Sequence, residues 1–314
     1  MDYKKKKLSK LVTCIIPTYK KFDFFESAIE SVLKQDYPEI ELIITDDASD
    51  NFNEEYIDSY IRKNKKDNIK NICIIKHKKN IGTVKNLNYA VSQCNGEIII
   101  PLACDDIFRT ENIISKIVER FEQSKCQILV CSRLKVSQDL SKKIRQMPHP
   151  GYRKFIDKYL DSAENQFVHL AVGEGMEFAS GAAMYYKKDF FDKLGGYDER
   201  YLLWEDGPFI AKVTREGYAI KTGYDIVSIY YRDGGISSKK QKNNLESRIN
   251  IDYKNYIINE FLSYPEKFNK EQLKILQYRY DELNNQNKNV LHSFKIKKHF
   301  IKIKIIKFLY RYFF

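Results

Sequence analysis

The first 115 residues alternate short apolar runs, rich in β-branched side chains, with stretches of helical spacing. The runs are residues 11–16, 41–45, 72–76 and 97–101, and the helical stretches are 24–34, 54–65 and 84–91. Short runs that are apolar at almost every position are typical of parallel strands buried on both faces. Strands that alternate with helices over short links build a doubly wound sheet. The predicted fold class is therefore α/β: a doubly wound mixed sheet flanked by helices, with a helical basic tail at the C-terminus.

This alternation ends near residue 115. The elements predicted beyond it are a helix at 113–121, strands at 128–131 and 179–186, a short helix at 189–193 and a helix at 203–215. Residues 133–175 are polar and rich in aromatics, and no regular structure is predicted for them. We predict a nucleotide-binding half in residues 1–115, a substrate-binding half in 116–245 and a helical extension in 246–314.

The chain is strongly basic, with a net charge of +12 and a pI near 9.1. Such an excess indicates a polyanionic partner, which could be nucleic acid, an anionic membrane or a phosphorylated substrate. The basic residues cluster at the two ends: Lys4 to Lys7 form one group, and no acidic residue follows Glu282. No nucleic-acid-binding motif accompanies the charge, so nucleic acid is not the expected partner.

The sequence also indicates a location in the cell. No uninterrupted apolar stretch is long enough to span a membrane, and residues 11–17 are too short and too polar-flanked for a signal peptide. The six cysteines show no C-x-x-C spacing, and we interpret them as core residues in a reducing compartment. A cytoplasmic protein is therefore expected.

Two pairs of aspartates each follow an apolar strand. Asp46-Asp47 comes after residues 40–44, and Asp105-Asp106 comes after residues 98–102. Open α/β sheets bind ligands at the carboxyl ends of their strands. Carboxylates at that edge can contact a nucleotide and hold a divalent metal, although aspartate pairs also simply form turns.

Further stretches complete a pattern with these two pairs. They are Val12 to Tyr19, Ser31 to Gln35 with Tyr37-Pro38, Asp46 to Asp50, Asn80-Ile81-Gly82 with Asn88, Asp105-Asp106, Gly195 to Glu199 and Trp204-Glu205-Asp206. In this order they resemble an inverting family 2 glycosyltransferase with the Rossmann-like GT-A fold, of the type that builds bacterial surface polysaccharide. The resemblance extends over residues 11–240 and does not include the C-terminal tail.

The resemblance implies that a hexosyl group passes from a nucleotide-sugar to an acceptor hydroxyl, with an oxocarbenium-like transition state. Mn²⁺ or Mg²⁺ suits the leaving diphosphate. By the resemblance, Asp106 would be the metal ligand and Asp105 a contact to the ribose or to the metal's shell. Many relatives carry a further Asp where this chain has Ala103. A catalytically silent relative that binds sugar or acts as a scaffold therefore stays open as an alternative.

Most of the other implied residues bind the donor. Asp47 resembles the family's base-reading aspartate, which favours a uridine donor. Residues 230–237 resemble the loop that closes over the donor, where an arginine would clamp the diphosphate. The remaining donor-binding residues implied are Pro17, Thr18, Tyr19, Glu26, Asn80, Gly82 and Arg232.

The implied catalytic group is Asp206, at the start of a predicted helix. It would act as the general base, and the neighbouring Glu205 could raise its pKa by like-charge repulsion. Trp204 offers an apolar face for the acceptor sugar. The alternative for Asp206 is that its carboxylate only caps the helix.

From Phe294 onward, lysines alternate with isoleucine and phenylalanine. In a helix, one face would hold Lys304, Lys307 and Arg311, and the opposite side would hold Ile305, Phe308, Leu309 and Tyr312. This pattern predicts an in-plane helix on an anionic membrane, at the inner face of the cell membrane. The alternative is a helix packed on the catalytic domain or on a partner. Together with the resemblance, the tail implies a glycan or a polyprenyl-diphosphate-linked acceptor.

Overall fold

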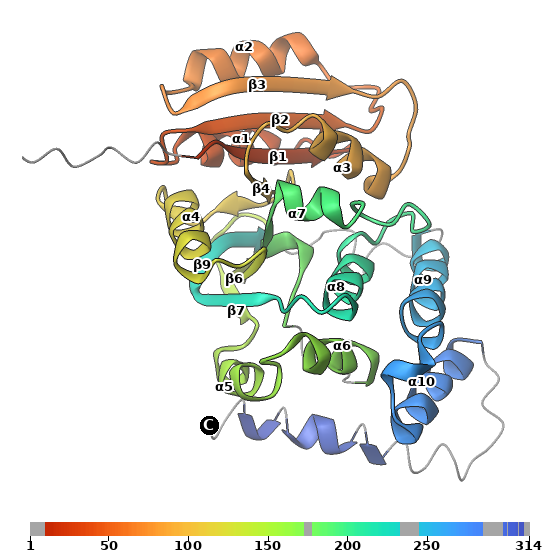
Figure 1. The fold of residues 1–314 in the computed structure, drawn as a ribbon. Helices are drawn as coiled ribbons and strands as arrows, with labels where there is room; N and C mark the ends of the chain where they lie inside the picture. The colour runs from red at the N-terminus through yellow and green to blue at the C-terminus, as the bar shows by residue number, and fades with distance from the viewer. Residues whose placement is uncertain are drawn as a thin grey trace, which may run out of the picture.

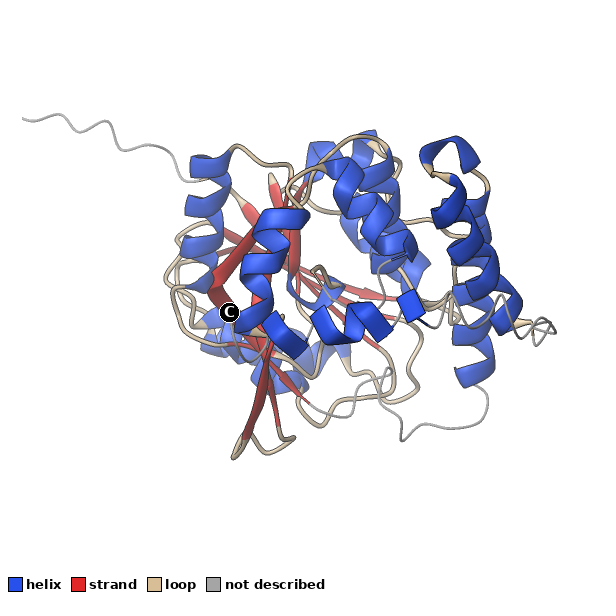
Figure 2. Ribbon diagram, turned by 90° about the horizontal axis from the view of Figure 1, so that it is seen from below, coloured by secondary structure: helices blue, strands red, loops and turns tan. Residues whose placement is uncertain are grey.

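The computed structural model describes residues 10–172, 178–232, 245–284, 298–299, 301–306 and 308–310. Nine strands among these residues form one mixed sheet, which is flanked by helices on both faces (Figures 1 and 2). The strands are β1 (Val12–Thr18), β2 (Ile40–Asp46), β3 (Ile69–Lys76), β4 (Ile98–Pro101), β5 (Ile107–Phe108), β6 (Ile128–Val136), β7 (Lys143–Met147), β8 (Met184–Lys187) and β9 (Lys221–Arg232). Their order is β3-β2-β1-β4-β8-β6-β9-β5, and β7 pairs with β6.

The first half of the sheet is parallel. β1 pairs with β2 and with β4, and β2 pairs with β3, all in parallel. The helices that connect these strands are α1 (Phe25–Leu33), α2 (Glu54–Asn64) and α3 (Thr83–Ser92). All four strands and three helices lie where the sequence predicts them, which confirms the α/β fold class.

Alternate residues of the central strands belong to two different hydrophobic cores. Cys14 and Ile16 of β1 pack with α1 and α2, whereas Ile15 packs with α3. This alternation follows from the two-residue period of a strand. Both cores continue past residue 115, so the predicted divisions at 115 and 245, which stay predictions, do not coincide with breaks in the packing.

The second half of the sheet is mixed. β8 runs antiparallel to β4 and to β6, and β9 runs parallel to β6. The expectation of irregular structure at 133–175 is wrong, because the part of this segment up to residue 172 is mostly regular. It contains the end of β6, the strand β7, α5 (Pro150–Tyr159) and α6 (Ala163–Val172). β7 is an exposed edge strand with the sequence KIRQM, so it carries no apolar pattern by which it could be recognised.

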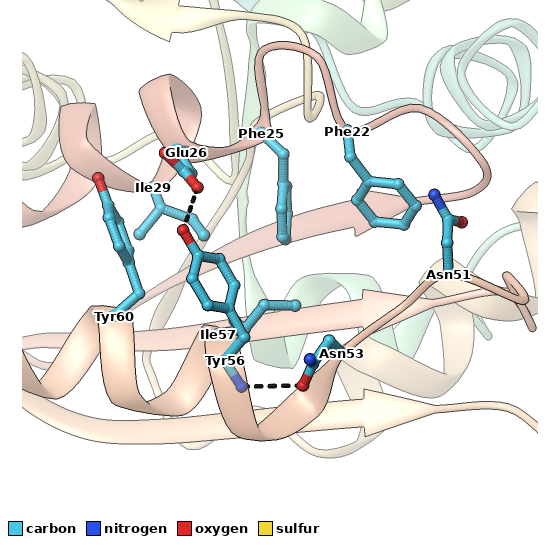
Figure 3. Close-up of a pocket in the computed structure, with 9 residues that line it drawn as sticks. All are labelled: Phe22, Phe25, Glu26, Ile29, Asn51, Asn53, Tyr56, Ile57 and Tyr60. Atoms are coloured by element: carbon cyan, nitrogen blue, oxygen red, sulfur yellow. Dashed lines mark hydrogen bonds between the residues drawn. The ribbon is translucent and has the colours of Figure 1, made fainter.

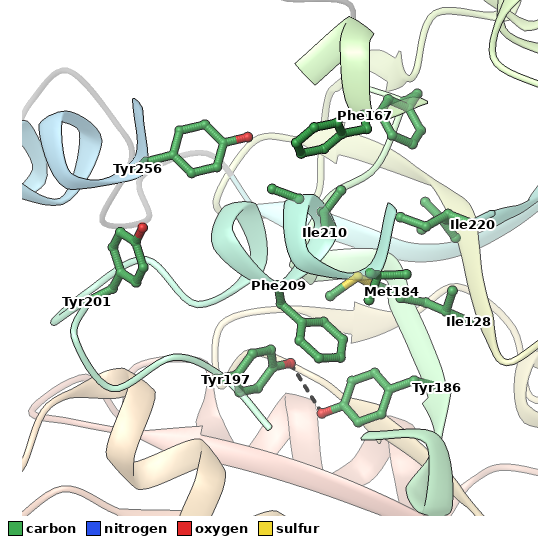
Figure 4. Close-up of a cluster of buried hydrophobic side chains, with 14 of the residues drawn as sticks. Ile128, Phe167, Met184, Tyr186, Tyr197, Tyr201, Phe209, Ile210, Ile220 and Tyr256 are labelled. Carbon is green, nitrogen blue, oxygen red and sulfur yellow. Dashed lines mark hydrogen bonds between the residues drawn. The ribbon is translucent and has the colours of Figure 1, made fainter. Parts of the chain in front are cut away.

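Five more α-helices and a π-helix in the second half and the extension complete the framework. They are α4 (Ile113–Ser124), α7 (Lys188–Lys193), α8 (Asp206–Arg215) and, in the C-terminal extension, α9 (Leu245–Tyr256), followed by a π-helix at Ile257–Leu262 and α10 (Lys270–Leu283). The extension shares an aromatic core with the sheet domain: Phe261 and Phe268 pack on Phe167 of α6, with ring centroids 5.3 Å from it. Figure 4 shows Tyr256 of α9 beside this cluster. The extension is therefore packed into the domain.

The helical residues between 298 and 310 present two faces. Inward, Ile303 packs against the core and the Tyr310 ring meets Phe155 of α5 at 5.4 Å. Outward, Ile301, Ile305 and Phe308 are each more than half exposed. The exposed Lys298, Lys302 and Lys304 flank this apolar row. Lys307, Arg311 and Tyr312 lie outside the described residues.

Two further expectations concern the whole described chain. None of its helices combines the length and the apolar character that crossing a membrane requires. All six cysteines are free, and Cys14, Cys94 and Cys131 are buried in the cores as expected. Burial raises the pKa of each of these three thiols.

Candidate active site

The first candidate residues lie at the carboxyl ends of β1 and β2. Thr18 is paired in register with Asp46, and its carbonyl oxygen accepts a hydrogen bond from the Asp47 N–H at 3.1 Å. Thr18 is buried, whereas the Tyr19 side chain is 41% exposed. Pro17 lies within β1, opposite Thr45 of β2. The structure thus brings Thr18, Tyr19 and Asp47 to one edge of the sheet.

Asp47 holds the turn that precedes α3. Its carboxylate accepts hydrogen bonds from the backbone N–H groups of Ile81, at 2.7 Å, and Gly82, at 2.9 Å. Asn80 donates from its side chain to the Asp47 carbonyl oxygen at 3.4 Å. Asp47, Asn80 and Gly82 are therefore one cluster, as a shared site requires. Asp46 takes no part in it, because its carboxylate binds the N–H and hydroxyl of Ser49.

Glu26 lies apart from this cluster. Its side chain points from α1 toward α2, where the Tyr56 hydroxyl donates to it at 2.5 Å (Figure 3). It lines a pocket of about 180 Å³ between the two helices, together with Phe22, Phe25 and other side chains. The interaction that the structure provides for Glu26 is thus with α2, not with Thr18 or Tyr19.

The loop after β4 contains a buried carboxylate. Asp106 is 1% exposed, and its Oδ1 accepts a hydrogen bond from the Arg232 N–H at 3.0 Å. Burial, and then the charge of Asp105, raise the pKa of Asp106 well above its usual value. Among the described residues, its Oδ2 has no hydrogen-bond partner. Asp105 is partly exposed.

These two carboxylates fit a divalent metal that is shared with a substrate. No group of three or more His, Cys, Asp or Glu side chains suited to a metal occurs in the described part of the chain. Mg²⁺, however, is commonly held by one or two carboxylates together with phosphate oxygens and water. The unpartnered Oδ2 of Asp106 and the partly exposed Asp105 provide such a pair.

Arg232 is buried, and its guanidinium already forms hydrogen bonds within the protein. Its guanidinium donates to the carbonyl oxygens of Asp105, at 2.5 Å, and Gln138, at 3.0 Å, and lies 4.2 Å from the Phe24 ring centroid. It therefore joins β9 to the Asp105-Asp106 loop. The rest of the predicted closing loop, residues 233–237, lies outside the described residues.

The second carboxylate pair, Glu205 and Asp206, lies at the start of α8. Asp206 accepts hydrogen bonds from the N–H groups of Gly181, at 2.5 Å, and Gly207, at 2.7 Å. A Cβ at Gly181 would stand 3.1 Å from both Asp206 Oδ2 and Glu205 Oε1. Gly181 therefore lies against both carboxylates, and only glycine leaves them this room.

The raised pKa in this pair is found on Glu205. Burial, and then the charge of Asp206, raise the pKa of Glu205 from 4.5 to about 8. A carboxyl group with this pKa is mostly protonated at neutral pH. Strongly perturbed carboxyl groups are concentrated at functional sites.

Trp204 is half-buried by aromatic rings of the extension. Its ring centroid lies 4.6 Å from that of Tyr256 and 5.7 Å from that of Tyr253. The indole also covers Gly207, where a Cβ would lie 2.4 Å from two ring carbons. Part of the surface expected to receive an acceptor sugar is therefore occupied by protein.

The two halves of the site meet at Gly82. This residue has a φ of +91°, and a Cβ on it would lie 2.9 Å from the Leu202 side chain. The turn bound by Asp47 thus touches the loop that leads into Glu205 and Asp206. A second link joins α3 to the same loop, because the Asn88 side chain both donates to and accepts from the backbone of Tyr197.

Two residues of this region were not expected from the sequence. Gly181 contacts the Asp206 carboxylate, and Asp252 of α9 accepts hydrogen bonds from the N–H groups of Leu202 and Leu203. Both contacts join residues far apart in the chain, and no local motif marks either residue.

Comparison with known proteins supports the fold and the family. The sequence model of glycosyl transferase family 2 matches residues 13–195, more than half of the chain. An uncharacterized glycosyltransferase of Nostoc sp. is 26% identical over 258 residues, which are 80% of this chain and 75% of that relative. The chain covers 39% and 58% of the length of two further curated relatives.

Solved structures show the same architecture. TarS of S. aureus (residues 1–349), which has also been solved with UDP-GlcNAc, superposes with a TM-score of 0.59 at 17% identity, over 88% of this chain and 73% of TarS. A mannosyltransferase of Pyrobaculum calidifontis, solved with GDP-Man and Mn²⁺, gives a TM-score of 0.57 at 15% identity, over 88% of this chain and 70% of that one. The sheet therefore has the predicted GT-A fold, and the match over residues 13–195 means that this chain belongs to glycosyl transferase family 2.

Proposed function

We propose that this protein transfers one hexosyl group, with inversion, from a UDP-sugar to a hydroxyl of a glycan or polyprenyl-diphosphate-linked acceptor in surface-polysaccharide synthesis. The observation that carries the proposal is the contact between Gly82 and Leu202. It joins the turn bound by Asp47, on the donor side, to the loop that ends in Glu205 and Asp206. The residues proposed to bind the donor and to catalyse transfer thereby lie close together, as transfer between two bound substrates requires.

The donor's base would lie at the edge formed by Thr18, Tyr19 and Asp47. A carboxylate has room for about four hydrogen bonds, and the N–H groups of Ile81 and Gly82 use two at Asp47. The remaining capacity suits the imide N–H of uracil. The exposed Tyr19 ring provides a surface on which the base can stack.

Asp105 and Asp106 would hold Mn²⁺ or Mg²⁺ together with the diphosphate. A bound divalent ion neutralises the negative charge that grows on the leaving diphosphate. Arg232 keeps the two carboxylates in place through its bonds to the backbone of Asp105 and the side chain of Asp106. The arginine thus acts by positioning the loop, and in this conformation it is not free to clamp the donor.

Asp206 would be the general base. As the acceptor oxygen bonds to the anomeric carbon, the bond from that carbon to the diphosphate breaks, and the hydroxyl proton passes to Asp206. The N–H groups of Gly181 and Gly207 hold its carboxylate in one orientation. Glu205 remains mostly protonated below its pKa of about 8, so it adds no second negative charge beside the base at neutral pH.

The acceptor would be reached at the inner face of the cell membrane. The outward row of Ile301, Ile305 and Phe308, with exposed lysines on both sides, has the arrangement of a helix that lies in a membrane interface. The lysines suit anionic headgroups. The inward face of the same helix packs on α5, so membrane contact and packing on the domain involve opposite faces.

The donor site is tested by thermal stability in the presence of UDP-, dTDP-, GDP- and CMP-sugars, each with Mn²⁺ and with EDTA. Uridine donors are expected to stabilise the protein when metal is present, by about 2.7 kcal/mol at a hundredfold excess over Kd. Asp106→Asn should lose the metal-dependent part of this stabilisation. If no nucleotide stabilises the folded protein, the donor assignment is wrong, and the silent sugar-binding or scaffold relative becomes the better reading.

The base is tested with Asp206→Asn. This change keeps the shape of the side chain but removes its ability to accept a proton, so turnover should fall about 10²–10⁴-fold. Donor affinity, measured by calorimetry, should be unchanged. Asp225→Asn, at an exposed aspartate on β9 that pairs with Arg120, is the control. Turnover equal to that of the control would rule out Asp206 as the base.

The raised pKa of Glu205 predicts how stability changes with pH. An acid whose pKa rises from 4.5 to about 8 on folding binds its proton more tightly in the folded state. Its contribution to the free energy of unfolding therefore declines as the pH rises from about 4.5 to 8. Glu205→Gln cannot ionise, so the Tm of this variant relative to the wild type should increase over the same range. Glu55→Gln, at an exposed position of α2, is the control, and equal pH profiles for both variants would contradict the assignment.

Membrane contact is tested by sedimentation with lipid vesicles. The protein should bind vesicles that contain anionic lipid, and Ile305→Glu should weaken the binding because it places a charge in the outward row. Ile251→Glu is a matched control, since Ile251 on α9 is 57% exposed and Ile305 is 53% exposed. Equal losses in the two variants, or equal binding to neutral vesicles, would show that the helix is not the membrane contact.

A further inference from the structure

The loop that leads into Glu205 and Asp206 is attached to α9 through its backbone. Asp252 is 3% exposed. Its carboxylate accepts hydrogen bonds from the N–H groups of Leu202, at 3.2 Å, and Leu203, at 2.9 Å. Residues 202–205 belong to no helix or strand, so these N–H groups have no partner from regular structure. A single buried carboxylate therefore fixes the backbone three residues before Asp206.

The Trp204 side chain of the same loop is also held by α9. Trp204 packs on the rings of Tyr253 and Tyr256, which lie one and four residues after Asp252 on α9. The Tyr253 hydroxyl is held in turn by Arg279 of α10, at 2.6 Å. The loop thus rests on two helices of the extension.

The π-helix that follows α9 adds a third attachment. Glu260 is buried and accepts hydrogen bonds from the Tyr201 hydroxyl, at 3.1 Å, and from Arg215 at the end of α8, at 2.5 Å. Figure 4 shows Tyr201 on the chain that leads into α8, with Tyr256 above it in the same view. The extension therefore holds both the entrance to the loop and the far end of the helix that Asp206 begins.

We propose that Asp252 is a positioning residue for the catalytic carboxylates, and that the C-terminal extension thereby completes the active site. The inference rests on the proposed role of Asp206 as the base. Only Trp204 and Glu205 separate Asp206 from the anchored backbone of Leu203. A shift of this loop would move the carboxylate away from the acceptor hydroxyl, whereas the turn at Gly82 on the donor side would stay bound to Asp47.

Trp204 makes this inference measurable without any substrate. It is the only tryptophan of the chain, so fluorescence excited at a wavelength that tyrosine does not absorb reports on this loop alone. Asp252→Ala removes the acceptor of the Leu202 and Leu203 N–H groups and should loosen the loop. We expect its emission maximum to shift to longer wavelength and acrylamide quenching to increase, while far-UV circular dichroism stays unchanged.

The catalytic readout separates positioning from general stability. With donor and acceptor, Asp252→Ala should lower kcat about 10–100-fold, since small misplacements of a catalytic group have effects of this size. Donor affinity should be retained. Asp252→Asn keeps one acceptor oxygen and should lie between Ala and the wild type in both readouts, and it also serves if the alanine variant does not fold.

Asn269→Ala is the matched control within the extension. Asn269 caps α10 through the N–H groups of Glu271 and Gln272, so its loss lowers stability without touching the loop. Its fluorescence and kcat should match the wild type. A wild-type Trp204 signal in Asp252→Ala, or a shifted signal with unchanged kcat, would overturn the inference. A wild type without turnover would instead refute the proposed function, because the fluorescence test does not depend on it.

Discussion

Buried carboxylates that accept hydrogen bonds from backbone N–H groups hold the loops of this site together. The loops at the end of an open sheet have N–H groups that no helix or strand satisfies, and each one left buried and unpaired is costly. A carboxylate can satisfy two at once with charge-assisted bonds. Four aspartates of this site accept such bonds, and of these only Asp206 is not fully buried: Asp47 binds Ile81 and Gly82, Asp106 binds Arg232, Asp206 binds Gly181 and Gly207, and Asp252 binds Leu202 and Leu203. Most of them join segments that are distant in the sequence, so they determine how the loops are placed relative to one another.

The same arrangement explains why the pKa of some of these carboxyl groups is raised. A carboxylate with two N–H partners is stabilised in its charged form, whereas one that is buried with a like charge beside it holds its proton. Asp106 has one N–H partner and one open oxygen, and its pKa is raised. On the proposed function, that unpartnered oxygen would bind the metal ion. Glu205 lies against Gly181 beside Asp206, and the raised pKa of this pair falls on it. The same few carboxyl groups therefore hold the loops in place and are proposed to bind the metal and to act as the base.

The parts of this architecture that are local in sequence could be predicted, and the parts that depend on distant contacts could not. The parallel strands follow from their apolar runs, and with the strands the positions of Asp47 after β2 and Asp106 after β4 could be predicted. The partners of Asp47 are backbone groups, which leave no trace in the residue types. Arg232 was expected to clamp a diphosphate because of its chemistry, but its burial under Phe24 depends on the fold. Asp252 lies about fifty residues from its partners in an unremarkable helical stretch, and β7 carries the polar sequence of an edge strand.

Different parts of the chain support the proposed donor site and the loop that contains the proposed base. The family match ends at residue 195, before Glu205, Asp206 and the whole extension. The matched part contains the residues proposed to bind the donor. The loop with the proposed base is supported from α9 and the π-helix instead, through Asp252 and Glu260. A change of acceptor would therefore, on the proposed function, involve the extension and this loop together and would leave the strand ends proposed to hold the donor unchanged. On the proposed function, acceptor choice and the orientation of the base are coupled through α9, whereas donor choice depends on the parallel half of the sheet.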